Sequence, residues 1–319
     1  MQRHAQITAR VIDRLKLKQL RLLIEVDRHR SILHAARALN LSQPAATKMV
    51  KDMELDFEVL LFERTNRGVT PTDSGAALIK GARLIFSQIA GTAQEIEDLS
   101  GGRAGRVVVG TLLAASSRLL PLAIQRALAA RPRLAIKVVE GTNEMLMPRL
   151  RAGELDLVVG RLPMQRYRSD LGQRRLFDDP VALVVRAGHP LLALEAPVFD
   201  DLRDYGWILS PVETTLRRQI DQYFIDQDQY APPQVVDSVS FLTNRALLLG
   251  TDMICAMPAE VVAGGAAEGL VALPLSLPFG ARPVGASYRN ATSLSPAALA
   301  FLSALEDVTA GLPDIAPRT

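Results

Sequence analysis

The chain has 319 residues, enough for about two or three domains with separate cores. Its composition, with 48% hydrophobic and 22% charged residues, is that of an ordinary soluble protein, and no apolar stretch approaches the roughly 20 residues of a membrane helix. The basic N-terminal segment lacks the apolar core of a secretory signal, so we expect a cytoplasmic protein without membrane attachment. The single cysteine, Cys255, excludes an internal disulfide and lies in an apolar run typical of a buried core residue. The four histidines show no metal-ligand spacing, and no metal site is predicted.

Positive charge is concentrated at the N-terminal end of the chain. The net charge is only +3, but residues 1–70 hold 13 Lys and Arg against 8 Asp and Glu, and the remainder holds 24 against 26. A basic head on a slightly acidic body predicts that the head binds a polyanion.

Three short helices are predicted in the head. Apolar residues spaced three and four apart indicate a helix from about Leu17, and Ser31 can cap a second one. The small residues Ala35 and Ala36 allow the close helix crossing of a helix-turn-helix. Ser42 can cap the third helix.

The third helix, from Gln43 to about Leu55, divides into two faces. Its predicted buried stripe consists of Ala45, Ala46, Met49, Val50 and Met53. The residues that we predict to contact DNA are Ser42, Gln43, Pro44, Thr47, Lys48 and Lys51. Glutamine can pair with adenine, threonine can touch a thymine methyl group or a phosphate, and lysine can bind phosphate or guanine. The alternative for this face, taken alone, is an ordinary solvated helix surface.

A hairpin follows the third helix. Residues 60–64 form a short predicted strand, and residues 66–68 form a turn. This hairpin carries Arg64 and Arg67, which are added to the predicted DNA contacts because they can reach phosphates or the minor groove.

The residues of this head match a known signature at consistent spacing. The matching positions are Ser31, Ala35, Ala36, Leu39, Leu41, Ser42, Gln43, Pro44, Ala45, Thr47, Glu54, Leu61, Phe62 and Arg64, followed by residues 69–72 and Gly75. They resemble the signature of the LysR-type transcriptional regulators. Two departures are that Phe57-Glu58 stands where this family usually has Leu-Gly, and that the chain begins about a dozen residues earlier than most members.

The resemblance implies a fold and a function. The implied fold class is α/β with an N-terminal winged helix-turn-helix, a long linker helix and a two-lobed regulatory domain similar to periplasmic binding proteins. The implied function is sequence-specific transcription regulation in response to a small-molecule effector. The implied partners are double-stranded DNA with a pseudo-palindromic operator, further copies in a homodimer or homotetramer, and RNA polymerase. Overall character is closest to members that regulate sugar uptake or aromatic-acid catabolism.

One long helix is predicted from Thr72 to Ser100, roughly 40 Å in length at 1.5 Å per residue. Apolar residues on alternating steps of four and three form a heptad seam with a polar lapse at Thr92. The seam predicts dimerisation, which would place two third helices about 34 Å apart on DNA. The alternative is packing against its own domain. The predicted dimerisation residues are Leu78, Ala82, Ile85, Ile89 and Ile96.

From residue 106 onward, strand and helix patterns alternate. The order β-α-β-α-β over residues 106–160 predicts a parallel sheet with helices on both faces, and a second strand series opens at residues 181–185. A late strand at residues 282–288 and a final helix from Ser295 suggest two α/β lobes between which the chain crosses twice. The predicted domains are 1–71 (DNA binding), 72–102 (linker) and 103–319 (regulatory), with lobe I at about 103–164 and 281–319 and lobe II at about 165–280.

Polar residues follow the predicted strands of both lobes, where ligands of open α/β sheets bind. The candidate effector-binding residues are Ser116, Ser117, Thr142, Asn143, Arg161, Ser210, Thr214 and Thr215. Together they offer hydroxyl, amide and guanidinium groups to an organic acid or a sugar derivative. The alternative for each is an ordinary helix cap or turn residue.

Two other classes of protein are weighed against a regulator. A solute-binding α/β protein would use the head only for oligomerisation, and the missing export signal and the basic third helix argue against it. An enzyme is not predicted, because the chain has no nucleophile elbow, phosphate-binding loop or dinucleotide fingerprint. No cofactor is predicted, and His189 is expected to be a surface turn residue.

Overall fold

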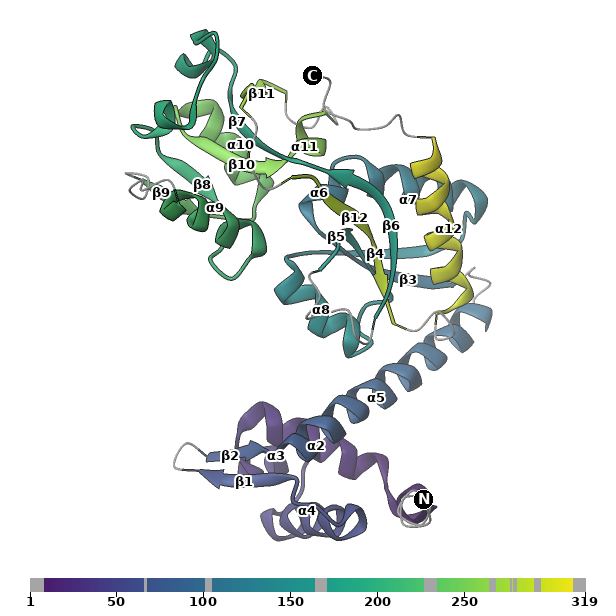
Figure 1. Cartoon of the computed structure of the whole chain (residues 1–319). Helices are drawn as coiled ribbons and strands as arrows, with labels where there is room; N and C mark the ends of the chain where they lie inside the picture. The colour runs from purple at the N-terminus through teal and green to yellow at the C-terminus, as the bar shows by residue number, and fades with distance from the viewer. Residues whose placement is uncertain are drawn as a thin grey trace. The chain divides into compact units, whose positions relative to one another are not determined.

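The computed structural model describes residues 9–65, 68–100, 105–163, 171–226, 234–263, 268–275, 277, 280–289 and 294–311. The chain divides into two compact units, Met1–Ala93 and Gln94–Thr319 (Figure 1). No helix in these ranges combines the length and the apolar character needed to cross a bilayer.

The described part of the N-terminal unit contains a short helical segment at residues 9–14, three further helices, a hairpin and the first part of a long helix. Its elements are α2 (Leu17–His29), α3 (Ile32–Ala38), α4 (Gln43–Phe57), β1 (Phe62–Thr65), β2 (Gly68–Pro71) and α5 (Asp73–Ser100). The caps predicted from the sequence are present, because the Ser31 hydroxyl accepts a hydrogen bond from the backbone N–H of His34 and the Ser42 hydroxyl accepts one from Ala45. Strands β1 and β2 pair antiparallel and form the predicted hairpin.

The start of α5 is fixed tightly against the hairpin. The Thr72 hydroxyl donates to the carbonyl oxygen of Leu60 at 2.7 Å and accepts from the N–H of Gly75 at 3.0 Å. A Cβ atom on Gly75 would lie 1.9 Å from the carbonyl oxygen of Leu61, so only glycine allows this approach. The Arg83 side chain also pairs with Asp27 of α2 at 2.8 Å.

The C-terminal unit is built on two five-stranded sheets. The first sheet has the order β4-β3-β5-β12-β6, and its strands are β3 (Arg106–Thr111), β4 (Ala135–Glu140), β5 (Leu157–Arg161), β6 (Gly172–Asp179) and β12 (Arg282–Tyr288). Strand β3 pairs parallel with β4 and β5, which confirms the predicted parallel core, and β12 runs antiparallel to β5 and β6. The helices of this part are α6 (Leu113–Ser116), α7 (Leu119–Ala130), α8 (Asn143–Arg151) and α12 (Pro296–Ala310).

The second sheet has the order β11-β7-β10-β8-β9. Its strands are β7 (Val181–Arg186), β8 (Trp207–Leu209), β9 (Val235–Asp237), β10 (Ile254–Pro258) and β11 (Leu270–Ala272). The helices that accompany it are α9 (Thr215–Asp226), α10 (Phe241–Gly250) and α11 (Ala259–Ala263), with the 3₁₀ turns η2 (Pro190–Ala193) and η3 (Phe199–Leu202). Trp207, the single tryptophan of the chain, is buried in the core of this lobe.

The structure corrects the expected boundary between the lobes. The sequence expectation assigned residues from about 165 onward to lobe II, but β6 belongs to the first sheet. The reason is its antiparallel pairing with β12 along residues 172–179, where a Cβ on Gly285 would lie 2.1 Å from the carbonyl oxygen of Arg174. The chain therefore first crosses between the lobes at Pro180, directly after β6.

The burial of His189 differs from the expectation, and the burial of Cys255 agrees with it. His189 is buried instead of lying at the surface: its Nδ1 accepts from the N–H of Leu191, and its Nε2 lies 3.1 Å from the carbonyl oxygen of Asp252. Cys255 is buried as predicted, and burial raises the pKa of its thiol to about 12.

Candidate nucleic-acid interface and effector site

Helix α4 separates its two predicted faces largely as the sequence indicates. Ala46, Val50 and Met53 are buried in the core of the unit, and Ala45 and Met49 are half-buried. On the opposite face Ser42, Gln43, Pro44, Lys48 and Lys51 are exposed and Thr47 is half-buried. Both lysines and the amide of Gln43 are thus available to a ligand in solvent, while the Ser42 hydroxyl is used by the cap. Arg67 lies outside the described residues, and for Arg64 only the backbone, in β1, is described.

The seam of α5 is split between two environments. Ala82 is buried in the core of the N-terminal unit and Leu78 packs against that core, so both serve the packing alternative instead of dimerisation. Ile85, Ile89 and Ile96 are exposed by 40%, 45% and 60% of their surface. An apolar stripe with this exposure in the described chain is the part of the seam that can meet a second copy.

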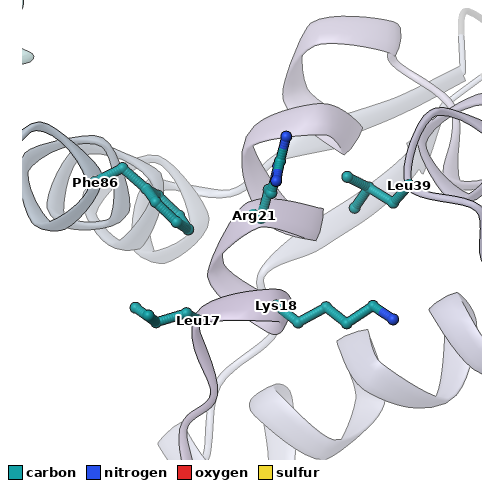
Figure 2. Close-up of a pocket in the computed structure, with 5 residues that line it drawn as sticks. All are labelled: Leu17, Lys18, Arg21, Leu39 and Phe86. Atoms are coloured by element: carbon teal, nitrogen blue, oxygen red, sulfur yellow. The ribbon is translucent and has the colours of Figure 1, made fainter. Parts of the chain in front are cut away.

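The N-terminal unit also contains an open cavity of about 300 Å³ between α2, α5 and the residue that ends α3. Figure 2 shows Phe86 of α5 and Leu39 on opposite sides of the α2 residues, with Lys18 and Arg21 among them. Its lining combines apolar side chains with two cations, and it includes none of the predicted effector-binding residues.

The carboxyl ends of β4 and β5 bring three of the predicted effector-binding residues together. The Asn143 side chain donates to the carbonyl oxygen of Arg161 at 3.1 Å, and Thr142 is the residue before it. Thr142 occupies the N-cap position of α8, yet its hydroxyl makes no cap hydrogen bond. Among the described residues, three buried polar atoms here have no hydrogen-bond partner: Thr142 Oγ1, Asn143 Oδ1 and Arg161 Nε. Buried polar atoms are ordinarily paired, so these atoms indicate a place for a polar ligand or water.

Arg161 is not the free charge partner that the sequence suggested. Its Nη2 lies 3.3 Å from Asp179 Oδ2 and 3.1 Å from the carbonyl oxygen of Pro180, at the point where the chain leaves lobe I. Burial lowers the pKa of Arg161, although Asp179 opposes this shift, and burial likewise raises the pKa of Asp179. One edge of the guanidinium is therefore committed to the lobe junction, and Nε remains for a ligand.

Asp179 connects this arginine to α11 of the second lobe. Its Oδ1 accepts a hydrogen bond from the backbone N–H of Glu260 at 3.1 Å. The Glu260 side chain is fully buried, 3.6 Å from the Arg118 guanidinium, and burial raises its pKa with a contribution from Asp179. The Ser117 hydroxyl donates to the carbonyl oxygen of Glu260 at 3.5 Å. Ser117 and Arg161 thus meet at a buried charged cluster that joins the lobes.

Sequence reasoning missed Asp179, Glu260 and Arg118. The available signal was an acidic residue directly beside a strand that is otherwise apolar, as in Asp179 before β7 and Glu260 after β10. Such a residue is rarely buried without a partner. Their partners could not be identified, because Asp179 and Glu260 are distant in the sequence.

The remaining candidates make ordinary local contacts. The Ser116 hydroxyl donates to the carbonyl oxygen of Leu113, because Ser116 is the last residue of the short helix α6. Thr214 Oγ1 lies 2.9 Å from Ser210 Oγ and accepts from the N–H of Arg217, and the Thr215 hydroxyl accepts from Arg218. No hydrogen bond described joins the three lobe II residues to Thr142 or Asn143.

Comparison with known proteins gives two family matches and several related chains. Residues 17–76 match the bacterial regulatory helix-turn-helix protein, lysR family, and residues 100–310 match the LysR substrate binding domain. The chain is 33% identical over 294 residues to the HTH-type transcriptional regulator GbpR of Azospirillum brasilense, which covers 92% of this chain and 86% of the relative.

Solved structures share the fold. Full-length CbnR, complexed with its target DNA, superposes with a TM-score of 0.60 at 19% identity, over 92% of this chain and 99% of CbnR. The BenM effector binding domain with its effector benzoate superposes with a TM-score of 0.52 at 20% identity, over 65% of this chain and 92% of that domain.

Proposed function

The chain belongs to the LysR family of DNA-binding transcriptional regulators with an effector-binding domain, and from this premise we propose which of its residues carry each role. The exposed face of α4 reads the operator, and the carboxyl ends of β4 and β5 bind a small anionic effector. The observation that carries the effector site is the group of three unpartnered buried atoms on Thr142, Asn143 and Arg161 among the described residues. In this proposal residues 1–71 bind DNA, residues 72–102 form the linker, and residues 103–319 form the regulatory domain, with the boundary between its lobes moved to Pro180.

The DNA face is supported by charge and exposure on α4. Lys48 and Lys51 are exposed, and Gln43 is exposed in the first turn of the helix, where the dipole favours an approaching phosphate. Thr47→Ala and Lys48→Ala together are expected to weaken operator binding by about one to two orders of magnitude while dimerisation is retained. Footprinting on the DNA upstream of the protein's own gene provides the assay, and unchanged protection by the double variant would exclude this face.

Support for an anionic effector comes from the donors. A hydroxyl hydrogen, the N–H at Arg161 Nε and the amino end of α8 all favour a carboxylate, and Asn143 Oδ1 can accept from a hydroxyl group. Benzoate is the effector of the BenM domain that shares this fold. We therefore propose an organic acid with at least one further polar group, either aromatic or sugar-derived.

Calorimetric titration with benzoate, hydroxybenzoates and sugar acids tests this site. Thr142→Ala is expected to weaken binding of a confirmed ligand about tenfold, the usual value of one hydrogen bond to a charged group. Thr251→Ala is the matched control, because its hydroxyl donates to the carbonyl oxygen of Leu247 and the residue is not among the candidate effector-binding residues. If Thr142→Ala binds the ligand as tightly as the control and the wild type do, the effector site lies elsewhere.

Oligomerisation completes the proposal. Ile85, Ile89 and Ile96 bury their exposed stripe against a second copy, giving a dimer and then a tetramer in the cytoplasm, with no catalytic activity of its own. The effector acts by favouring one quaternary state by about 1–3 kcal/mol, which changes DNA bending and contact with RNA polymerase. Ile89→Glu is expected to yield monomers in light scattering, whereas Leu84→Ala, at a half-buried position on the same helix, leaves the dimer intact.

A further inference from the structure

The carboxyl end of α4 has an unusual backbone and an unfavourable charge. Glu58 caps the helix with φ at +57°, a left-handed conformation that glycine adopts without strain. Its last two turns also contain Asp52, Glu54 and Asp56, and its last turn has no basic residue. Carboxylates at the negative end of a helix dipole destabilise it, and they repel a nearby phosphate backbone.

The cations that offset these acids come from another part of the chain. Residues 9–14 are helical, and Arg10 Nη2 lies 2.7 Å from Glu58 Oε1. Arg14 Nη1 lies 3.5 Å from Asp56 Oδ1. The segment continues into Leu15, whose N–H donates to the carbonyl oxygen of Val11 and whose side chain packs against the core of the unit. It precedes residue 17, where the helix-turn-helix match begins.

Glu58 is also the first residue of the connector, residues 58–61, which joins α4 to the wing, the hairpin of β1 and β2. The N–H of Leu61 donates to Glu54 Oε1 at 2.9 Å, and the carbonyl oxygen of Leu60 accepts from Thr72. The last two residues of the connector, Leu60 and Leu61, are thus tied both to α4 and to the start of α5. The ion pair with Arg10 holds the residue at which the chain turns out of α4.

We propose that the helical segment 9–14 is a positioning element for DNA recognition, in which Arg10 pairs with Glu58 and Arg14 with Asp56 to fix the carboxyl end of α4 and the connector to the wing. The pairs hold a strained helix end in one conformation and neutralise two acids near the DNA-binding surface. Arg10 contributes more than Arg14 to fixing the end of α4, because its contact is shorter and its side chain is less exposed. This inference rests on the proposed DNA-binding role of α4.

A double-mutant cycle with Arg10→Ala and Glu58→Gly tests the proposal. The probe is a duplex obtained with the wild-type protein by in vitro selection from random sequence. Arg10→Ala is expected to weaken binding about fivefold, the upper value for a partly exposed ion pair. In the Glu58→Gly background, where the strain and the partner are both absent, Arg10→Ala is expected to change affinity less than twofold. Arg10→Lys, which keeps the charge, should restore most of the affinity.

Two outcomes would overturn the positioning role. If Arg10→Ala weakens binding equally in both backgrounds and lowers the salt slope by about 0.9, Arg10 contacts a phosphate directly. If it lowers the unfolding temperature but leaves the affinity unchanged, the pair is only structural. The double variant Thr47→Ala with Lys48→Ala, measured in the same assay, tests the exposed face of α4 separately. A failure of the proposed DNA-binding role of α4 is therefore distinguishable from a failure of the Arg10–Glu58 coupling.

Discussion

The DNA-binding face and the effector site are built in opposite ways. The face of α4 consists of residues one helical turn apart, and a capping serine and a buried stripe of Ala46, Val50 and Met53 are enough to orient it. The effector site joins residues from separate strand ends, and Arg161 reaches it only because β5 lies beside β3 in the sheet. Local patterns can therefore predict the first, whereas the second depends on long-range packing. Changes at the lobe junction should cost more stability than changes on α4.

The largest expected effect is that of Asp179→Ala. It leaves the Arg161 guanidinium buried without its carboxylate, which costs about 3–5 kcal/mol of unfolding free energy. Fluorescence of Trp207, buried in lobe II, follows the unfolding of the regulatory domain in denaturant. Exposed Asp204→Ala is the control. A loss below about 1 kcal/mol would show that the pair does not secure the junction.

Gly75→Ala is expected to cause the next largest loss of stability, in this case in the N-terminal unit. The added Cβ would meet the carbonyl oxygen of Leu61 at 1.9 Å, so the start of α5 must shift, at a cost of about 1–3 kcal/mol. Gly81→Ala is the matched control on the same helix, since a Cβ there meets nothing within 4 Å and favours helix. Circular dichroism on heating should show opposite shifts for the two variants, and equal shifts would contradict the close approach.

Features that depend on nearby residues were predictable from the sequence, whereas features that depend on distant strand pairing were not. The caps at Ser31 and Ser42, the hairpin and the parallel order of β3, β4 and β5 were predictable because each depends on residues close in the sequence or on strand alternation. The placement of β6 was not, because its pairing with β12 joins residues more than 100 positions apart. Thr142 and Asn143 could be proposed as a site because they directly follow a predicted strand. The commitment of Arg161 to Asp179 could not be predicted, because Asp179 ends β6, which the sequence had assigned to the other lobe.

Ser42→Ala is expected to have a smaller effect on the recognition helix. The Ser42 hydroxyl accepts from the N–H of Ala45, and loss of such a cap costs about 1 kcal/mol. Ser42→Asp should retain stability but weaken DNA binding, because a carboxylate at this end of α4 repels phosphate. Thermal unfolding and binding measured on the same samples separate the two roles of this residue. Retained DNA binding by Ser42→Asp would place the amino end of α4 away from the phosphates.

The smallest effect, and the one that depends on pH, is expected for Glu260→Gln. Burial raises the pKa of Glu260 above its ordinary value of 4.5, with Arg118 opposing the shift and Asp179 adding to it. Between the ordinary and the raised pKa the folded protein holds a proton that the unfolded chain has released, so the wild-type contribution of this group falls as the pH rises through that window.

Glutamine does not titrate, so Glu260→Gln should match the wild type in stability below the ordinary pKa of the carboxyl group. It should be more stable than the wild type once the pH exceeds the raised value, by less than the burial penalty alone, because the loss of attraction to Arg118 offsets part of the relief. Denaturant unfolding between pH 4 and 8, followed by Trp207 fluorescence, measures this difference. Glu195→Gln, at an exposed position, should show no such trend. A loss of stability in Glu260→Gln that appears as the pH rises would mean that the attraction of Arg118 outweighs burial, and the Arg118–Glu260 pair would then be net favourable.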